Sequence, residues 1–301
     1  MLAGLAAGPT LRAQEASPPA SAAPADTAEV ASKAPVRFRP IESNVIINLP
    51  SVEVPTEGTL TFLVTHRFTQ RIQDGSLENF FTLDNGNEWG FGLWYAPIKN
   101  LNAGFYRTSQ LGTYEASAQY ELPRAGGFDA SLRVGEDWRT YSSAASPKSS
   151  FFTQAVLAYS IGPYARITAV PTYLQRTNGF VRPTQPPPPG DKSCTEIPDS
   201  DSFNCSGLYE NVFNVPVGVS IAITHSITIH GEVTPRLAKV NPSGVGWCVT
   251  VEKSLLRHRF AFFAGNQRAT TVNQYTGGIP MSRSPSSVYI GFNLFRAWKL
   301  N

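Results

Sequence analysis

The chain has 301 residues with a formal net charge of +3, of which 42% are hydrophobic, 11% aromatic and 16% charged. The charged share lies well below the roughly 25% of ordinary soluble domains, and the small net charge with scattered Lys and Arg argues against a nucleic-acid partner. No stretch reaches the roughly 20 continuous apolar residues of a transmembrane helix. This argues against a helical membrane protein. A membrane β-barrel is still compatible with the sequence, because its strands alternate and its average hydropathy can resemble that of a soluble protein.

The N-terminus favours an exported protein. Residues 1–7 are apolar and precede a segment that resembles a cleavage site, although the usual basic region is missing. We interpret 1–14 as a signal-peptide remnant, with a flexible cytosolic tail as the alternative. Residues 15–57 are expected to form a disordered or extended periplasmic segment, because 15–35 are rich in Ala, Pro, Ser, Glu and Asp. The sequence leaves open whether residues 36–57 enter a barrel lumen as a plug.

From Gly58 onward, apolar and polar side chains alternate in segments of roughly ten residues, which is the period of a β-strand. In one such segment, Tyr114 and Ala116 share a face, whereas Thr113 and Glu115 share the opposite face. About twelve segments can be distinguished, an even number within the range of bacterial barrels. Strands are expected near residues 58–69, 87–96, 100–109, 112–121, 127–137, 150–160, 163–174, 211–223, 226–236, 245–254, 257–267 and 287–297.

The connections between these segments alternate in length. Short links follow every second segment, and the links between them are longer, except at 109–112. Short periplasmic turns alternating with long extracellular loops are typical of outer-membrane barrels. We therefore predict an all-β fold for residues 58–301, a transmembrane antiparallel up-and-down β-barrel in the bacterial outer membrane with both termini periplasmic. Aromatic residues near segment ends, such as Trp89 and Trp298, fit girdles at the membrane interfaces, although strands are enriched in aromatic residues in any case.

The cysteines suggest one disulfide and no metal site. Cys194 and Cys205 lie close together in the long, Pro-rich link 175–210, which in an exported protein indicates a local disulfide. Cys248 lies within a strand pattern without an obvious partner. The absence of a Cys-x-x-Cys motif gives no reason to expect a metal or a cofactor. A link of this length is expected either to contact a surface partner or to fold over a pore mouth.

Several motifs in the first third of the chain resemble a family of uncharacterised bacterial outer-membrane β-barrels, a domain of unknown function. The motifs are Ile47-Asn48-Leu49-Pro50, Gly58-Thr59-Leu60, Thr65-His66-Arg67-Phe68, Asn79-Phe80-Phe81-Thr82-Leu83-Asp84, Gly104-Phe105-Tyr106-Arg107-Thr108-Ser109 and Thr113-Tyr114-Glu115. The later strands resemble the family only in pattern, and the Pro-rich link departs from it. The resemblance implies an outer-membrane barrel but no particular activity.

The face expected to point inward carries charges of both signs. Its candidate pore-lining residues are Arg67, Glu115, Arg133, Asp137, Glu232, Glu252 and Arg259.

Asp84 and Arg107 are candidates for the extracellular mouth. Arg107 shares a face with apolar residues, so it is expected to snorkel to the headgroups unless a bulge turns it inward. A cluster of His66, Arg67 and Asp84 near the first loop is a further possibility, with structural hydrogen bonding favoured over metal binding.

These features favour a porin-like channel for small solutes. A barrel of about twelve strands is intermediate in size, so a lumen filled by neutralising pairs is equally compatible with the sequence. The alternative function is therefore a non-conducting scaffold that binds an unknown protein partner, surrounded in either case by outer-membrane lipid. If the lumen is open, replacing Arg133 and Arg259 with Glu should shift its selectivity toward cations.

Two other classes are disfavoured. An enzyme is not expected, because no Gly-x-Ser-x-Gly motif is present and no serine is marked out beside His66, His225, His230 or His258. A soluble, lipocalin-like barrel with its apolar face inward is the main structural rival, but the chain length and the alternation of the links argue against it.

Overall fold

The computed structural model describes residues 44–78, 83–84, 86–124, 126–140, 149–176, 194–196, 203–205, 211–235, 245–278 and 287–300. The expected signal remnant 1–14, the segment 15–43 and the family-like residues 79–82 lie outside the described residues. What the sequence indicates for them stays a prediction.

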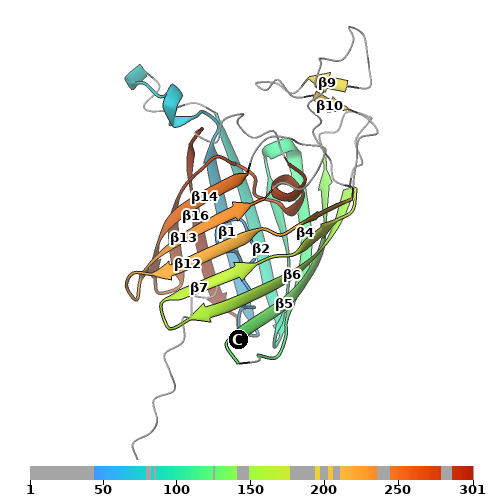
Figure 1. Ribbon diagram of the computed structural model, residues 1–301, viewed down its shortest axis with the longest axis vertical. Helices are drawn as coiled ribbons and strands as arrows, with labels where there is room; N and C mark the ends of the chain where they lie inside the picture. Colours follow the sequence, from blue (N-terminus) through green and yellow to red (C-terminus); the bar gives the residue numbers. More distant parts are fainter. Residues whose placement is uncertain are drawn as a thin grey trace, which may run out of the picture. The chain divides into compact units, whose positions relative to one another are not determined.

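Twelve antiparallel strands close into a barrel, which confirms the predicted fold class (Figure 1). Two of the twelve are interrupted and therefore carry two labels each, β7 with β8 and β11 with β12. Closure is complete because β1 pairs with β2 on one side and with β16 on the other. The wall consists of β1 (Thr59–Phe68), β2 (Asn87–Ile98), β3 (Leu101–Thr108), β4 (Thr113–Glu121), β5 (Phe128–Arg139), β6 (Ser149–Ile161), β7 (Ala165–Ala169), β8 (Thr172–Leu174), β11 (Val212–Asn214), β12 (Val217–Ala222), β13 (Ile227–Thr234), β14 (Gly246–Leu255), β15 (His258–Gly265) and β16 (Tyr289–Lys299).

Two neighbouring strands, each expected as one segment, are interrupted at a proline. β7 and β8 are separated by Val170 and Pro171, and β11 and β12 by Val215 and Pro216. Proline has no N–H group to donate to the ladder, which explains both interruptions. The wall nevertheless stays hydrogen-bonded across them, because the Val170 N–H donates to the Pro216 carbonyl at 2.8 Å.

The polar face of each strand points into the barrel and the apolar face points outward. In β5, Asp129 and Arg133 are buried, whereas Phe128 and Leu132 are 61% and 50% exposed. An apolar exterior around a polar interior is the pattern of a membrane barrel. It rules out the lipocalin-like alternative, whose apolar face would be buried. Among the described residues, no helix has both the length and the apolar character needed to cross a membrane.

The connections differ between the two ends of the barrel, as the link lengths predict. At one end, called the turn end, short turns join β2 to β3, β4 to β5, β6 to β7, β12 to β13 and β14 to β15. At the opposite end, called the loop end, the links are longer, with η1 (Ile72–Asp74) in the first of them. The tight link between β3 and β4 is the exception and contains η3 (Gln110–Gly112). β1 begins and β16 ends at the turn end.

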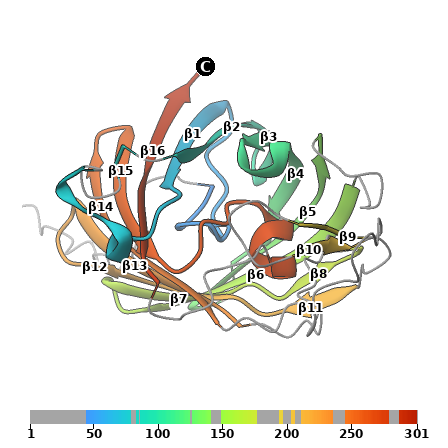
Figure 2. The ribbon, with the colours of Figure 1, turned by 90° about the horizontal axis from the view of Figure 1, so that it is seen from above.

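Two segments of the chain occupy the lumen (Figure 2). Residues 44–57, called the strap, lie inside the barrel and join β1 at the turn end. Residues 266–278, called the insert, follow β15 at the loop end, fold inward and finish in the helical turn η4 (Gln274–Gly278). The question of whether residues 36–57 enter the lumen is thereby answered for the described part: the strap lies within the lumen together with the insert.

Aromatic side chains complete the interior and depend on glycines beside them. A Cβ atom at Gly92 would come within 2.1 Å of the Trp94 ring, and one at Gly104 would come within 2.3 Å of it. Such distances are far below van der Waals contact, so any other residue at these positions would displace the indole. The two glycines thus allow Trp94 to lie flat against the inner wall.

A separate two-stranded ladder lies within the long link. β9 (Cys194–Glu196) and β10 (Phe203–Cys205) pair so that Cys194 is directly opposite Cys205. Residues opposite each other in an antiparallel pair have Cα atoms about 4.5–5.5 Å apart, within the range of a disulfide. Their side chains lie outside the described part of the chain, so the disulfide stays a prediction that this register favours. Cys248 is a free, buried cysteine.

Candidate functional site: the occupied lumen

One carboxylate of the wall binds a turn of the strap. Glu232 of β13 accepts hydrogen bonds at Oε1 from the backbone N–H groups of Ile47 at 2.8 Å, Asn48 at 3.0 Å and Leu49 at 3.0 Å. The Asn48 N–H also lies 3.1 Å from Oε2. Three successive N–H groups that converge on one anion form a nest, and they compensate for burying its charge. Glu232 is therefore the main polar anchor of this turn.

Arg67 of β1 binds the same turn through side-chain amides. Its Nη1 donates to Asn293 Oδ1 at 2.8 Å, and its Nη2 donates to Asn48 Oδ1 at 3.1 Å. Asn293 in turn donates from Nδ2 to the Ile47 carbonyl at 3.0 Å. The guanidinium lies 4.0 Å from the centroid of the Phe263 ring, a cation–π contact that favours the buried charge. The turn is thus bound by the wall through both its N–H and its C=O groups.

Two further carboxylates bind the backbone of the insert. Glu115 of β4 accepts a hydrogen bond from the Val272 N–H at 3.1 Å, and Asp137 of β5 accepts one from the Asn273 N–H at 2.8 Å. Glu115 is also paired with Arg133. The wall therefore uses the same chemistry, carboxylate to backbone amide, for both occupants of the lumen.

Apolar contacts join the strap, the insert and the wall. Leu49 and Val52 of the strap share one buried cluster with Phe152 of β6 and with Val272 and Tyr275 of the insert. Two smaller clusters hold three more apolar strap residues. Val45 packs against the cluster around Trp94, and Ile46 and Ile47 belong to the cluster around Phe263. Because the first cluster is shared, displacing the strap uncovers apolar surface of the insert.

A second polar anchor holds the strap near the turn end. Glu53 forms an ion pair with Arg166 of β7, and Arg166 Nη2 also lies 3.2 Å from Asp129 Oδ2. The Val54 N–H donates to Glu121 Oε2 at 3.0 Å. This ion-pair cluster and Glu232 thus attach the strap to the wall through charged groups, and Gln119 of β4 adds a hydrogen bond to the Ser51 carbonyl at 2.7 Å.

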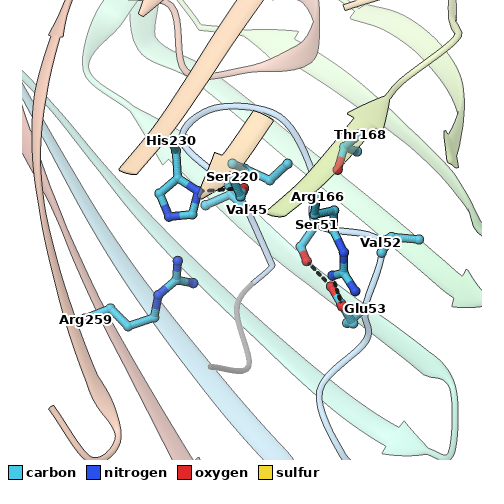
Figure 3. Close-up of a pocket in the computed structure, with 10 residues that line it drawn as sticks. Val45, Ser51, Val52, Glu53, Arg166, Thr168, Ser220, His230 and Arg259 are labelled. Carbon is cyan, nitrogen blue, oxygen red and sulfur yellow. Dashed lines mark hydrogen bonds and ion pairs between the residues drawn. The ribbon is translucent and has the colours of Figure 1, made fainter. Parts of the chain in front are cut away.

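A small pocket remains between the strap and the inner faces of β7, β12, β13 and β15 (Figure 3). Ser220 Oγ lies 2.8 Å from His230 Nδ1, and His230 Nε2 lies 3.5 Å from Glu252 Oε2. Glu252 is paired with Arg259. A serine, a histidine and a carboxylate in a row can form a hydrolytic triad. The pocket, however, has a volume of about 20 Å³, which holds about one water molecule and no ester substrate.

Other cavities around the strap are equally small. One beside Trp94 has a volume of about 20 Å³, and one beside Asn102 has a volume of about 10 Å³. Each has room for about one water molecule. Among the described residues, these three cavities beside the strap leave no room for a solute larger than water.

All of the candidate pore-lining residues lie on the inner wall and are buried. They contact the strap, the insert or one another, and their role in lining a pore stays a prediction. They are Arg67, Glu115, Arg133, Asp137, Glu232, Glu252 and Arg259.

The candidate mouth residues lie outside the lumen. Asp84 is exposed in the link between β1 and β2. Arg107 stays on the outer face of β3, because the register with β4 is regular through it and no bulge turns it inward. Its guanidinium lies 5.0 Å from the Trp89 ring centroid and 5.3 Å from that of Tyr114, as expected for an arginine that snorkels at a membrane rim.

The structure places His66 and Arg67, two members of the cluster considered with Asp84, on opposite faces of β1. His66 faces outward and stacks on Phe292 at 4.9 Å, whereas Arg67 faces inward. Adjacent residues of a strand point to opposite faces, so these two side chains cannot share a site.

The sequence analysis missed several residues that hold the strap and the insert. Gln154 and Arg166 lie on inward positions of segments that were correctly predicted, so alternation alone could have identified them. Asn48 has no periodic signal, because the strap is irregular. The one available signal was its place in the family-like motif Ile47-Asn48-Leu49-Pro50, to which no role was attached.

Comparison with known proteins identifies a family but no activity. A family model described as a membrane bound beta barrel domain (DUF5777) matches residues 41–298. No curated protein matches the chain. Among solved structures, the NanC porin is 7% identical, with a TM-score of 0.47, over 79% of this chain and 98% of the porin. An active-site variant of outer membrane phospholipase A from Escherichia coli is 10% identical, with a TM-score of 0.42, over 80% of this chain and 90% of the phospholipase.

Proposed function

The chain belongs to the family of membrane-bound β-barrel domains (DUF5777), and we propose that it is a gated outer-membrane channel for small hydrophilic solutes. In the described state, the strap and the insert close it. The proposal rests on one observation: the wall carboxylates Glu232, Glu115 and Asp137 bind the backbone of both occupants. Such a wall can be hydrated when the occupants leave, because its polar groups exchange amide partners for water.

Opening requires the strap to leave its attachments to the wall, of which two carry charged groups. At the first, Glu232 and Arg67 would exchange the amides of the strap for water. At the second, Arg166 would lose Glu53 but keep Asp129. Since the strap joins β1 at the turn end, it would withdraw through that end, whereas the insert would withdraw through the loop end.

The orientation in the membrane is part of the proposal. Short turns of outer-membrane barrels face the periplasm, so the turn end and both termini are assigned to that side. The long loop-end link that carries Cys194 and Cys205 would then face the exterior.

A non-conducting scaffold is the second candidate, and one observation favours it. Apolar strap residues take part in three interior clusters, so withdrawing the strap exposes apolar surface as well as polar groups. A strap that never leaves would make the barrel a rigid platform for a partner.

Single-channel recording in a planar bilayer separates the two candidates. We expect brief, rare openings of the wild-type barrel and more frequent openings of Glu232→Gln. A variant that lacks residues 44–55 should conduct steadily, because its insert loses the apolar cluster that it shares with the strap and then withdraws as well. Glu136→Gln is the matched control, because Glu136 faces outward and is exposed. Each sample must first show the slower migration of a folded barrel when it is left unheated. If the folded deletion variant stays silent, the channel proposal is wrong and the scaffold is favoured.

A further inference from the structure

Basic side chains gather on the outer face of β14, β15 and β16 at the turn end. Lys253 lies on β14, Arg257 lies in the turn that follows, His258 begins β15, and Arg296 lies near the end of β16. Lys253, Arg257 and Arg296 are exposed, and His258 is half-buried. These residues, called the basic rim, take no part in closing the lumen.

The strand register brings the members of the basic rim together. His258 and Arg296 are direct partners across β15 and β16. Lys253 pairs with Phe260, two residues from His258, so Lys253 and His258 are diagonal neighbours. The Ala297 N–H donates to the Arg257 carbonyl at 3.1 Å, which holds the turn against β16. The cations of Lys253 and Arg296 thus flank His258 on its two sides, and an anion bound there would offset the repulsion between the two cations.

The basic rim borders a surface that faces lipid. Further along the same strands, Val251 is 54% exposed and Phe262 is 58% exposed. Within the described β14, β15 and β16, no outward side chain is a carboxylate. The Arg296 guanidinium lies 5.0 Å from the centroid of Trp298, and tryptophan is typical of the headgroup level of a membrane. The basic rim therefore lies where lipid phosphates are found.

We propose that the basic rim binds the phosphate group of an anionic phospholipid. Arginine donates to phosphate oxygens in a bidentate manner, and Lys253 donates from Nζ to Ser226 Oγ at 2.8 Å with two more N–H groups to offer. The acyl chains would lie along the apolar side chains of the same three strands. Because the basic rim is continuous with an apolar wall, we assign the bound phosphate to a lipid and not to a soluble phosphate ion.

Quenching of Trp298 by brominated lipids tests the proposal on the folded barrel in detergent. Phosphatidylglycerol and phosphatidylcholine with the same brominated chains are added in turn, and the Trp298 signal is the difference between wild type and Trp298→Phe. We expect phosphatidylglycerol to reach half-maximal quenching at a mole fraction at least about fivefold lower than phosphatidylcholine. Lys253→Gln and Arg296→Gln should each reduce this preference by about fivefold.

Lys99→Gln is the matched control, because Lys99 is an exposed cation near the turn end outside the basic rim. It should leave the preference unchanged. Equal quenching by the two lipids would overturn the proposal. It would also be overturned if Lys99→Gln reduced the preference for phosphatidylglycerol as much as Lys253→Gln and Arg296→Gln do, because the protein would then attract negative charge in general. Full competition by inorganic phosphate would also overturn it, because the ligand would then be a free anion.

Discussion

Cys248 is a natural reporter of the position of the strap. Its side chain is buried on the inner wall of β14, where Sγ accepts a hydrogen bond from Asn48 Nδ2 at 3.4 Å. The same sulfur lies 3.5 Å from Glu232 Oε2. A water-soluble maleimide can reach this thiol only when the strap moves away. The labelling rate of Cys248 therefore measures how often the strap leaves.

We predict that Glu232→Gln speeds the labelling of Cys248 by about 5- to 100-fold. The variant loses a charged acceptor for three backbone amides, and leaving buried partners unsatisfied costs about 1–3 kcal/mol. The rate is measured by mass spectrometry in a background with Cys194→Ser and Cys205→Ser, so that Cys248 is the one thiol. In Glu136→Gln, Cys248 should be labelled as slowly as in the parent protein. Equal rates in the two Glu→Gln variants would show that the carboxylate does not hold the strap.

Ser220 and His230 allow the hydrolase alternative to be tested directly. Because the pocket beside them has a volume of about 20 Å³, we predict that a fluorophosphonate does not label wild-type Ser220. Ser220→Ala should lower the free energy of unfolding by about 1 kcal/mol, since it removes one buried hydrogen bond. Covalent labelling that disappears in Ser220→Ala would instead identify a nucleophile and reopen the question of an enzyme.

At the scale of elements, the strands were predictable and the contents of the lumen were not. Alternation located each strand within a few residues, because a sheet that separates lipid from a polar interior imposes a period of two on every segment. It also placed Glu232 and Glu115 on the inner face. The strap and the insert carry no such period. Their partners come from strands that meet only after the barrel closes, so no local pattern could reveal them.

We predict that the insert stays bound inside the lumen only while the Tyr275 side chain is present. This side chain is buried, belongs to the cluster shared with the strap, and accepts a hydrogen bond from Gln154 Nε2 at 2.9 Å. Removing a buried aromatic ring costs about 3–5 kcal/mol, so Tyr275→Ala should release the insert, whereas Tyr275→Phe should cost about 1 kcal/mol.

Trypsin cleavage after Arg268, within the insert, measures this release. A loss of about 3 kcal/mol corresponds to a rise in cleavage rate of about 100-fold for Tyr275→Ala. Tyr164→Ala is the control, because Tyr164 is 67% exposed in a turn-end connection. If Tyr275→Ala is cleaved no faster than this control, the insert is held by its polar contacts alone.

At the scale of the whole molecule, the charges of the wall decide what an open lumen would prefer. The inner wall carries arginines at 67, 133, 139, 166 and 259, and carboxylates at 88, 115, 121, 129, 137, 232 and 252. Acidic groups are thus in excess. Several arginines also keep an acidic partner on the wall: Arg133 stays with Glu115, and Arg259 stays with Glu252. Glu232 and Asp137, in contrast, lose their backbone partners when the strap and the insert leave.

We therefore predict that the variant lacking residues 44–55 conducts cations in preference to anions. Two unit charges about 8 Å apart in water interact by about 0.5 kcal/mol, so Glu232→Gln in this variant should lower the cation-to-anion permeability ratio about twofold. The ratio follows from the reversal potential in a salt gradient. Glu136→Gln, on the outer face, should leave it unchanged. An open channel that prefers anions would mean that the arginines, and not Glu232 and Asp137, face the solute.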